Sequence, residues 1–390
     1  MRNWLLPEYI EDVLPAEAAR LETMRRTLLD LFKVHGYQFV IPPMLEYMES
    51  LTTGVGHDLD LATFKVVDQL TGRLMGVRAD MTPQAARIDA HLLNHQGVTR
   101  LCYAGSVLRT QPDGLARTRE PLQLGAELYG HSGVESDIEI QQLMVKALQN
   151  LGITEIHIDF SHVNVFGSLV EASQLSPQLE QALFDALKTK NQSQVAVLTQ
   201  DLAPSVRDAL LHLTQLNGDA TVLDKAAKLL PQMASIQAAL AELQEVSVAM
   251  AELGVTCSFD LSELRGYHYH SGIVFAAYAK GFKGPLALGG RYDEVGQIFG
   301  RARAATGFSV DLRGIVTALP PAMMPTAILA PALKGQPPEF QAALTEKIDA
   351  LRAEGQVVVQ EMFNTETDAQ ELNCNKKLLH FASGWHVVDL

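Results

Sequence analysis

The sequence predicts an α+β protein, in which helices flank an antiparallel sheet that is interrupted by a helical insertion and followed by a small α/β unit. Three observations predict this class. Short strand-like runs follow one another, a long stretch at about 164–254 is helical in pattern and rich in Leu, Ala and Gln, and the segment PPAMMP at 320–325 indicates a linker. We therefore expect one large domain over residues 1–320, which contains the insertion, and a small C-terminal α/β domain over residues 321–390.

The first helix and strand follow from apolar spacing near the N-terminus. Apolar residues recur at helical intervals, which predicts an amphipathic helix over 15–35 that ends at Gly36. These residues are Leu21, Met24, Leu28, Leu31 and Phe32. The run YQFVIPP then predicts a strand over 37–43, because two prolines close it.

The rest of the large domain alternates between strand and helix patterns. Strands are expected before the insertion at 74–78, 101–109, 122–129 and 153–160, and after it at 256–261, 269–278 and 304–310. Helices are expected at 83–93 and 136–151. In the last part of the chain, TAILAP, a helix over 339–353, VVVQEMF and WHVVDL predict a small α/β unit.

Composition limits the partners and the compartment. Hydrophobic residues make up 47% of the chain and charged residues 19%, which is an ordinary globular balance. The formal net charge of −14 argues against tRNA as a partner, since a phosphate backbone needs Lys and Arg. No apolar run approaches the ~18 residues of a membrane span, and MRNWLLPEYIEDVLP does not form a signal peptide. We expect a soluble, cytoplasmic protein without a membrane partner.

The three cysteines also favour a reducing compartment. Cys102, Cys257 and Cys374 are odd in number and show no CxxC or Cys/His ligand spacing. They indicate neither a disulfide framework nor a structural zinc site, and we expect buried free thiols in the cytoplasm.

Four segments carry the motifs that point to chemistry. The segment RLCYAGSVLRTQPDGLARTREPLQLGAELYG, at 100–130, resembles motif 2 of class II aminoacyl-tRNA synthetases in its histidyl form, with Arg109 on a strand and Arg117 and Arg119 in the loop. LRGYHYHSGIVF at 264–275 resembles a signature peculiar to histidyl-tRNA synthetases. GGRYDEV at 289–295 and VRADMTPQAAR at 77–87 are similar to two further segments of that family. The four occur in the family's order across residues 1–320.

The residues of these segments also fit a pocket for free histidine. That ligand presents an ammonium, a carboxylate and an imidazole, so its site needs an acid, a base and a polar contact for the ring. On a strand, Gln123 and Glu127 face the same side, so we expect their amide and carboxylate to point into one cavity.

The resemblance implies a role for each residue of such a pocket. Asp80, Thr82 and Gln123 would lie near the amine and Glu127 near an imidazole nitrogen. Arg265 would hold the carboxylate, because a guanidinium matches its geometry. Tyr269 and His270 would line the side-chain pocket, and Tyr292 is a weaker candidate for the same wall.

Other interpretations of the same residues stay open. Arg109 or Glu127 alone on a strand is more often a solvated residue or part of a surface ion pair. Tyr267, His268, Tyr269 and His270 alternate as a strand would, so half of them are candidates for core or surface positions. His268 and His270 also raise the possibility of a metal site, but two histidines without a third ligand favour none.

Departures from the synthetase pattern argue against catalysis. Leu108–Gln111 stands where the family has Phe-Arg-x-Glu, so Gln111 replaces an acidic residue, and Pro121 replaces an aromatic one. In motif 3, Asp311, Arg313 and Gly314 stand where the family has Gly, Glu and Arg. The motif 3 arginine is therefore missing, a helical rotation aims Arg313 elsewhere, and Asp311 adds negative charge where phosphates would lie.

These losses affect ATP handling more than amino-acid binding. Removing one group that stabilises the transition state commonly costs about 2.7–4 kcal/mol. The C-terminal part is also shorter than a synthetase's anticodon-binding domain, and it is not basic. We expect no catalytic residues and no cofactor, and we regard Arg109 and Arg119 as a possible remnant of an anion or nucleotide site.

The whole chain resembles the regulatory subunits of ATP phosphoribosyltransferase, including LPEYIEDVLP near its start and CNKKLLHF and GWHVVDL near its end. The resemblance implies assembly with the short catalytic subunit in a hetero-octamer, pairing of the synthetase-like chains as dimers, and activation of the first step of histidine biosynthesis. It also implies feedback inhibition with L-histidine as effector. An active or atypical histidyl-tRNA synthetase and a stand-alone amino-acid-binding or protein-modifying paralogue are the alternatives.

Overall fold

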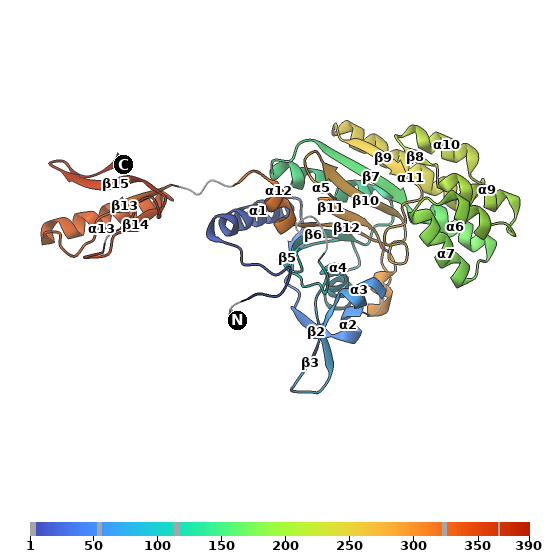
Figure 1. Ribbon diagram of the computed structural model, residues 1–390, viewed down its shortest axis with the longest axis horizontal. Coiled ribbons are helices and arrows are strands. Elements are labelled where there is room, and N and C mark those ends of the chain that lie inside the picture. The colour runs from blue at the N-terminus through green and yellow to red at the C-terminus, as the bar shows by residue number, and fades with distance from the viewer. Residues whose placement is uncertain (1–4, 53–56, 113–117, 322–325, 366) are drawn as a thin grey trace. The chain divides into compact units, whose positions relative to one another are not determined.

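The computed structural model describes residues 5–52, 57–112, 118–321, 326–365 and 367–390. Contacts divide the chain into two compact units, Met1–Pro320 and Pro321–Leu390 (Figure 1). Within the described residues, no helix combines the length and the apolar character that crossing a membrane requires.

A nine-stranded sheet forms the centre of the large unit. Its order is β1 (Gln38–Phe39), β5 (Thr99–Ser106), β6 (Leu122–Tyr129), β12 (Ala305–Asp311), β11 (Ala287–Arg291), β10 (Ile273–Ala279), β7 (Ile156–His162), β9 (Thr256–Asp260) and β8 (Asn217–Gly218). All neighbours pair antiparallel except β1 with β5 and β7 with β9. The expected antiparallel α+β architecture is confirmed.

Four helices pack on one face of this sheet and bury the main core. They are α1 (Pro15–Val34), α5 (Val134–Asn150), α11 (Ala234–Glu252) and α12 (Leu312–Ala318). Helix α1 ends before Gly36, whose backbone is left-handed at φ +85°, and its Phe32 packs edge-on against Phe308 of β12. Because this face is filled by apolar side chains, polar side chains of the central strands gather on the other face.

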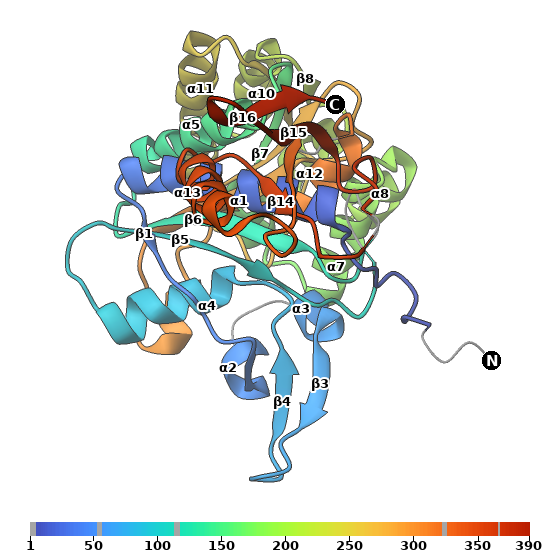
Figure 2. The ribbon, with the colours of Figure 1, turned by 90° about the vertical axis from the view of Figure 1, so that its left-hand side faces the viewer.

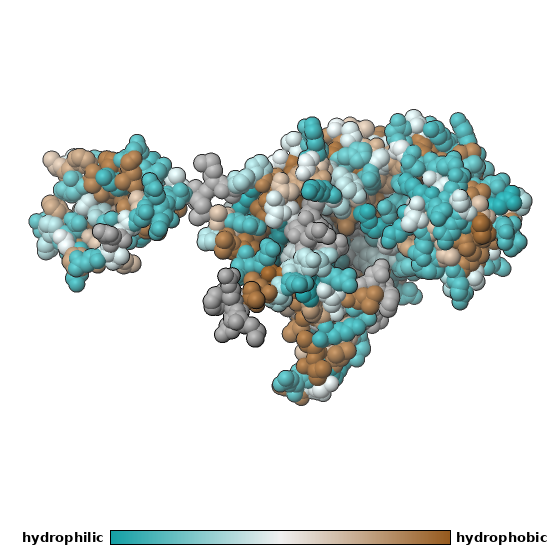
Figure 3. Space-filling model, in the orientation of Figure 1, coloured by the Kyte–Doolittle hydropathy of each residue, from teal (hydrophilic) through white to brown (hydrophobic). Residues whose placement is uncertain are grey.

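Smaller elements border the other face (Figure 2). The expected helix over 83–93 forms as α4 (Thr82–Arg87), which continues into the π-helical turn Ile88–Leu93. A three-stranded sheet has the order β2 (Leu45–Tyr47), β4 (Leu74–Val77) and β3 (Phe64–Val67), and it is accompanied by α2 (Met48–Thr52) and α3 (His57–Ala62). Figure 3 shows apolar side chains gathered on this small sheet, where Leu45, Val66, Val67, Leu70 and Leu74 are exposed.

The stretch that was expected to be helical forms six helices, the last of which is α11. The others are α6 (Val163–Ser173), α7 (Pro177–Lys188), α8 (Gln192–Leu198), α9 (Pro204–Leu213) and α10 (Thr221–Leu229). Ser176 and Asn191 accept hydrogen bonds from backbone N–H groups at the starts of α7 and α8, and prolines open α7 and α9. These caps explain why the helices begin at the polar and proline residues that interrupt the apolar pattern.

The structure differs from several sequence expectations, and of the strand expected over 37–43 only Gln38–Phe39 is a strand. The strand expected from Tyr269 begins only at Ile273, because Gly266 is left-handed at φ +64° and its carbonyl accepts hydrogen bonds from the backbone N–H groups of Tyr269 and His270. The two side chains therefore lie in a turn and do not alternate as in a strand. Strand β11 was not predicted, since its sequence, ALGGR, contains two glycines.

The described residues of the C-terminal unit form four strands and one long helix. Its sheet has the order β14 (Val358–Gln360), β13 (Ala327–Ala330), β15 (Cys374–Phe381) and β16 (Gly384–Asp389). Helix α13 (Pro338–Ala353) covers it with Leu344, Ile348 and Leu351, which pack in a cluster with Ile328 and Trp385.

Candidate functional site

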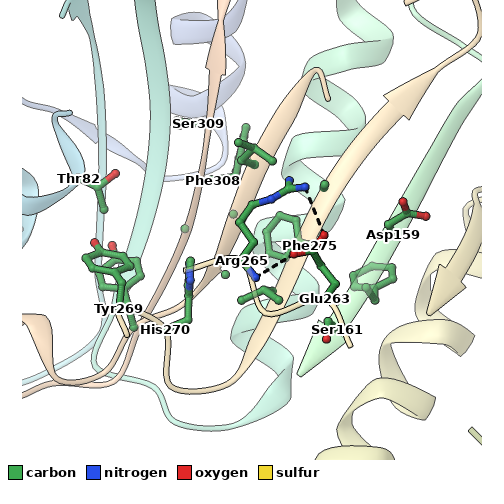
Figure 4. A pocket seen from close by; sticks show the side chains of 18 of the residues that line it. Thr82, Asp159, Ser161, Glu263, Arg265, Tyr269, His270, Phe275, Phe308 and Ser309 are labelled. Atoms are coloured by element: carbon green, nitrogen blue, oxygen red, sulfur yellow. Dashed lines mark hydrogen bonds and ion pairs between the residues drawn. The ribbon is translucent and has the colours of Figure 1, made fainter. Parts of the chain in front are cut away.

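A cavity of about 290 Å³ lies over the central strands of the large sheet (Figure 4). The strand register places Glu127, Gly307, Gly290, Val274 and Ser161 in one row across five strands, and all five residues line the cavity. The two glycines leave the floor without side chains there. An added Cβ would overlap the Glu127 carboxylate at Gly307, and at Gly290 it would lie 2.6 Å from the His270 ring.

Glu127 is the most deeply buried acid of the cavity, with 1% of its surface exposed. Tyr103 donates a hydrogen bond of 2.8 Å to Oε1, Tyr292 donates one to Oε2, and the Tyr103 hydroxyl lies 2.9 Å from Oγ1 of Thr82. Burial raises the pKa of Glu127 to about 8, although the two tyrosine hydrogen bonds oppose the shift. The carboxyl group can therefore take up or release a proton near neutral pH.

Asp80 and Gln123 are held together beside Glu127. Nε2 of Gln123 donates to Oδ1 of Asp80 at 2.8 Å, and its Oε1 accepts from the backbone N–H of Met81 at 2.9 Å. Asp80 and Thr82 line the cavity, whereas Gln123 does not. The Gln123 amide was expected to point into the cavity; in the structure it contacts Asp80 and the backbone of Met81, so it can orient the Asp80 carboxylate.

Arg265 lies in the turn region between β9 and β10 and faces the cavity (Figure 4). Its guanidinium lies 3.5 Å from the carboxylate of Glu263, and 42% of its side chain is exposed. In the described part of the chain, Arg265 and Arg109 are the basic residues that line the cavity. Arg109 also donates through Nε to the carbonyl of Ala79 at 3.3 Å.

Tyr269 and His270 also line the cavity. The Tyr269 ring stacks on Tyr292, with centroids 5.4 Å apart, and its buried hydroxyl has no hydrogen-bond partner within the described residues. His270 places Nδ1 3.2 Å from the carbonyl of Gly266. Burial lowers the pKa of His270 to about 4, so the ring is neutral near pH 7.

Arg119, the other residue expected as a remnant of an anion site, is not among the residues that line the cavity. Its Nε donates to the carbonyl of Arg109 at 3.2 Å and its guanidinium covers the ring of Phe64. Arg117 lies outside the described residues.

Asp311 and Arg313, the two charged residues of the motif 3 segment, do not line the cavity. Oδ1 of Asp311 accepts from the backbone N–H groups of Arg313 and Leu122, which places it at the start of α12. The Arg313 guanidinium donates to the carbonyls of Glu120 at 3.0 Å and Glu11 at 2.9 Å. The Arg313 guanidinium therefore points away from the cavity, as predicted, while the Asp311 carboxylate caps α12 and does not line the cavity.

The described residues contain no group of three or more His, Cys, Asp or Glu side chains that could hold a metal ion. His268 is exposed and packs against Phe184, with ring centroids 5.7 Å apart, while His270 lines the cavity. The two histidines thus have different surroundings.

Sequence reasoning missed Tyr103 and the residues at the far end of the cavity, Asp159, Ser161, Asp260 and Glu263. Tyr103 pairs with Gly125 across the hairpin of β5 and β6, so the register of that hairpin was the signal that could have revealed it. Asp159 and Ser161 come from β7, Asp260 ends β9 and Glu263 follows it; the places of these two strands in the sheet depend on the long insertion between them.

Two family models match the chain. Residues 9–315 match the model described as Histidyl-tRNA synthetase, and residues 325–388 match the model described as ATP phosphoribosyltransferase subunit HisZ C-terminal domain.

Relatives and solved structures agree with these matches. A protein of Methylobacillus flagellatus named ATP phosphoribosyltransferase regulatory subunit is 63% identical over 388 residues, which cover 100% of this chain and 99% of the relative. The structure of an ATP phosphoribosyltransferase regulatory subunit/histidyl-tRNA synthetase from Bacillus halodurans has a TM-score of 0.81 at 28% identity, covering 95% of this chain and 96% of that one. Histidyl-tRNA synthetase from Nostoc has the same fold, with a TM-score of 0.78 at 18% identity over 100% of this chain and 97% of its own.

Proposed function

This chain belongs to the family of ATP phosphoribosyltransferase regulatory subunits, and from that membership we propose that it binds free L-histidine and transmits its presence to a catalytic subunit. The chain is the non-catalytic member of the complex. It assembles with the short catalytic subunit, activates it, and reverses that activation when histidine occupies the cavity. A ligand shifts such an assembly only if it binds one state better than the other.

The observation that carries the histidine proposal is one cavity in which a buried acid, a second carboxylate and a guanidinium converge. We call Asp80, Thr82, Glu127, Arg265, Tyr269 and His270 the cradle. Asp80, oriented by Gln123, suits the ammonium, and Arg265 suits the carboxylate. Glu127, whose pKa lies near neutrality, suits an imidazole nitrogen in either protonation state, because it can accept or donate the shared proton.

The surroundings of motif 3 support the absence of catalysis. The Arg313 guanidinium is engaged by backbone carbonyls, and Asp311 caps α12. Neither residue is available to a triphosphate in the cavity, and Gln111 and Pro121 replace side chains that the synthetases use there. A nucleotide remnant at Arg109 remains part of the proposal, since that residue lines the cavity, whereas Arg119 contributes only through its hydrogen bond to Arg109.

We further propose that two copies of the chain pair with each other and with catalytic subunits in a hetero-octamer. The exposed apolar residues of the β2–β4–β3 sheet support self-association, because contiguous apolar surface often marks an interface. The free thiols of Cys102, Cys257 and Cys374 support a cytoplasmic location.

The test is co-purification with a short catalytic subunit, followed by an assay of phosphoribosyl transfer to ATP with and without L-histidine. We expect a stable complex, a higher rate than the catalytic subunit alone, and loss of that gain on adding histidine. Glu127→Ala should leave the complex intact and abolish the histidine effect. Absence of a complex, or rapid histidine-dependent charging of tRNA by the purified chain, would contradict the proposal.

A further inference from the structure

The cavity extends well past the cradle. From Glu127 on β6 to Ser161 on β7 the row crosses four interstrand steps, which at ~4.8 Å each amounts to about 19 Å. A free amino acid, with ~3.5 Å of backbone and one side chain, is much shorter. Figure 4 shows Ser161 and Asp159 at one end, Thr82 and Tyr269 at the other, and Arg265 between them. Histidine in the cradle therefore leaves the far end open.

Ser161 provides an unsatisfied polar atom at this far end. Its surface is 1% exposed, and its Oγ forms no hydrogen bond with any described residue. Asp159, two residues earlier on β7, faces the same side of the sheet, and both residues line the cavity. Buried hydroxyl groups are nearly always paired, so Ser161 Oγ can still form a hydrogen bond with a group bound in the cavity.

The charges at this end are negative. Asp260 and Glu263 each form an ion pair: Lys190 lies 2.7 Å from the Asp260 carboxylate, and Arg265 lies 3.5 Å from the Glu263 carboxylate. Asp159 differs: the groups near it are the hydroxyl of Ser258 and Nε2 of His157 at 3.2 Å, and no Lys or Arg of the described chain forms an ion pair with it. Of the three carboxylates at this end, Asp159 is thus the one for which the described residues supply no Lys or Arg partner.

We propose that Asp159 and Ser161 form a second binding site, which takes a primary ammonium group carried on a short alkyl chain. An ammonium donates three hydrogen bonds, and the Asp159 carboxylate and Ser161 Oγ both accept. Val274 and Ala276, which lie beside them on β10, give the alkyl chain an apolar surface. Phosphate-bearing ligands are disfavoured, because three carboxylates border this end.

The test uses n-butylammonium chloride as the probe and n-butanol as its neutral analogue. Each is titrated calorimetrically into the full chain, alone and with saturating L-histidine. We expect saturable binding of the ammonium with a Kd of about 1–10 mM, little change in that Kd with histidine present, and no saturable binding of the alcohol. Equal binding of the alcohol, or no saturable binding of the ammonium at about tenfold higher concentration, overturns the proposal.

Variants locate the site. Asp159→Asn should weaken butylammonium binding about tenfold, and Ser161→Ala severalfold. Asp201→Asn removes one exposed carboxylate elsewhere and should change nothing, which separates a built site from general attraction to an acidic protein. Glu127→Gln should weaken histidine binding only. Retained histidine binding or an unchanged melting temperature shows that each variant is folded. If folded Asp159→Asn and Ser161→Ala both bind butylammonium as the wild type does, the proposal is wrong, whatever the result for histidine.

Discussion

The carboxylate of Glu127 lies over Gly307 on the neighbouring strand, in the space that a side chain at position 307 would fill. The two residues form a cross-strand pair, and Tyr103 and Tyr292 hold the carboxylate there. Gly307→Ala should therefore displace the carboxylate and lower histidine affinity by at least about tenfold, since a buried charged hydrogen-bonding group is misplaced. Calorimetric titration with L-histidine measures the change.

Gly97→Ala is the matched control for this change. Nothing lies within 4 Å of a Cβ built at Gly97, so the added methyl group meets open space. Histidine affinity should stay at the wild-type value in Gly97→Ala. Wild-type affinity in Gly307→Ala would show that histidine does not depend on the position of Glu127.

The pKa of Glu127 predicts how stability depends on pH. Burial raises this pKa to about 8 from 4.5, so the folded protein holds the proton more tightly than the unfolded chain does. The resulting stabilisation is complete below about pH 4.5 and is lost as the pH rises through about 8. Between these values the free energy of unfolding should fall by up to ~1.4 kcal/mol per pH unit relative to Glu127→Gln, whose side chain does not titrate.

Urea unfolding of both proteins from pH 6 to 9, without histidine, measures this difference. Parallel pH profiles for the wild type and Glu127→Gln would show that the buried carboxyl group has an ordinary pKa. Because the comparison uses the slopes and not the absolute stabilities, a constant loss of stability from the amide does not affect it.

Strands with regular alternation of apolar and polar residues could be predicted from the sequence. Other strands form only because they pair with neighbours that are distant in the sequence. Strand β6 was predicted to its exact ends, because its pattern is bounded by Pro121 and Gly130. The sequence does not predict strand β11, because its two glycines have low strand propensity. Its pairing with β10 and β12 makes this segment a strand.

The candidate site shows the same division. Strand alternation correctly placed Gln123 and Glu127 on one face, but it did not show that the Gln123 amide would contact Asp80. The contact of Tyr103 with Glu127 depends on the cross-strand register, which a single strand's pattern does not contain. Motifs thus indicated the type of ligand, while distances between strands determined which side chains reach it.

Two buried glutamines allow a test of hydrogen-bond satisfaction. In Gln123→Met, the buried N–H of Met81 loses its acceptor and Asp80 loses a donor, so the free energy of unfolding should fall by about 1–3 kcal/mol. Histidine affinity should fall as well, because Asp80 is no longer oriented. Denaturant unfolding and calorimetry measure the two effects.

Gln141→Met makes the same replacement on α5, but we do not expect it to lower the free energy of unfolding. Gln141 is 0% exposed, and neither polar atom of its amide has a hydrogen-bond partner within the described residues. Replacing it with an apolar side chain of similar length should leave stability unchanged or raise it. Equal losses in the two variants would mean that packing, and not hydrogen bonding, determines both.

Arg291, in the GGRYD segment, forms a buried ion pair that should be costly to break from one side. Its guanidinium lies 2.6 Å from Asp137, with 6% and 1% of the two side chains exposed, and it also donates to Ser136 at 2.8 Å. Arg291→Met leaves the Asp137 carboxylate buried and uncompensated, so we expect a loss of about 3–5 kcal/mol in the free energy of unfolding.

Lys280→Met, which breaks the exposed pair with Glu155, should cost less than about 1 kcal/mol. The double variant Arg291→Met/Asp137→Leu removes both charges and should recover much of the loss; a double variant no more stable than Arg291→Met would show that Arg291 stabilises the fold through its other contacts.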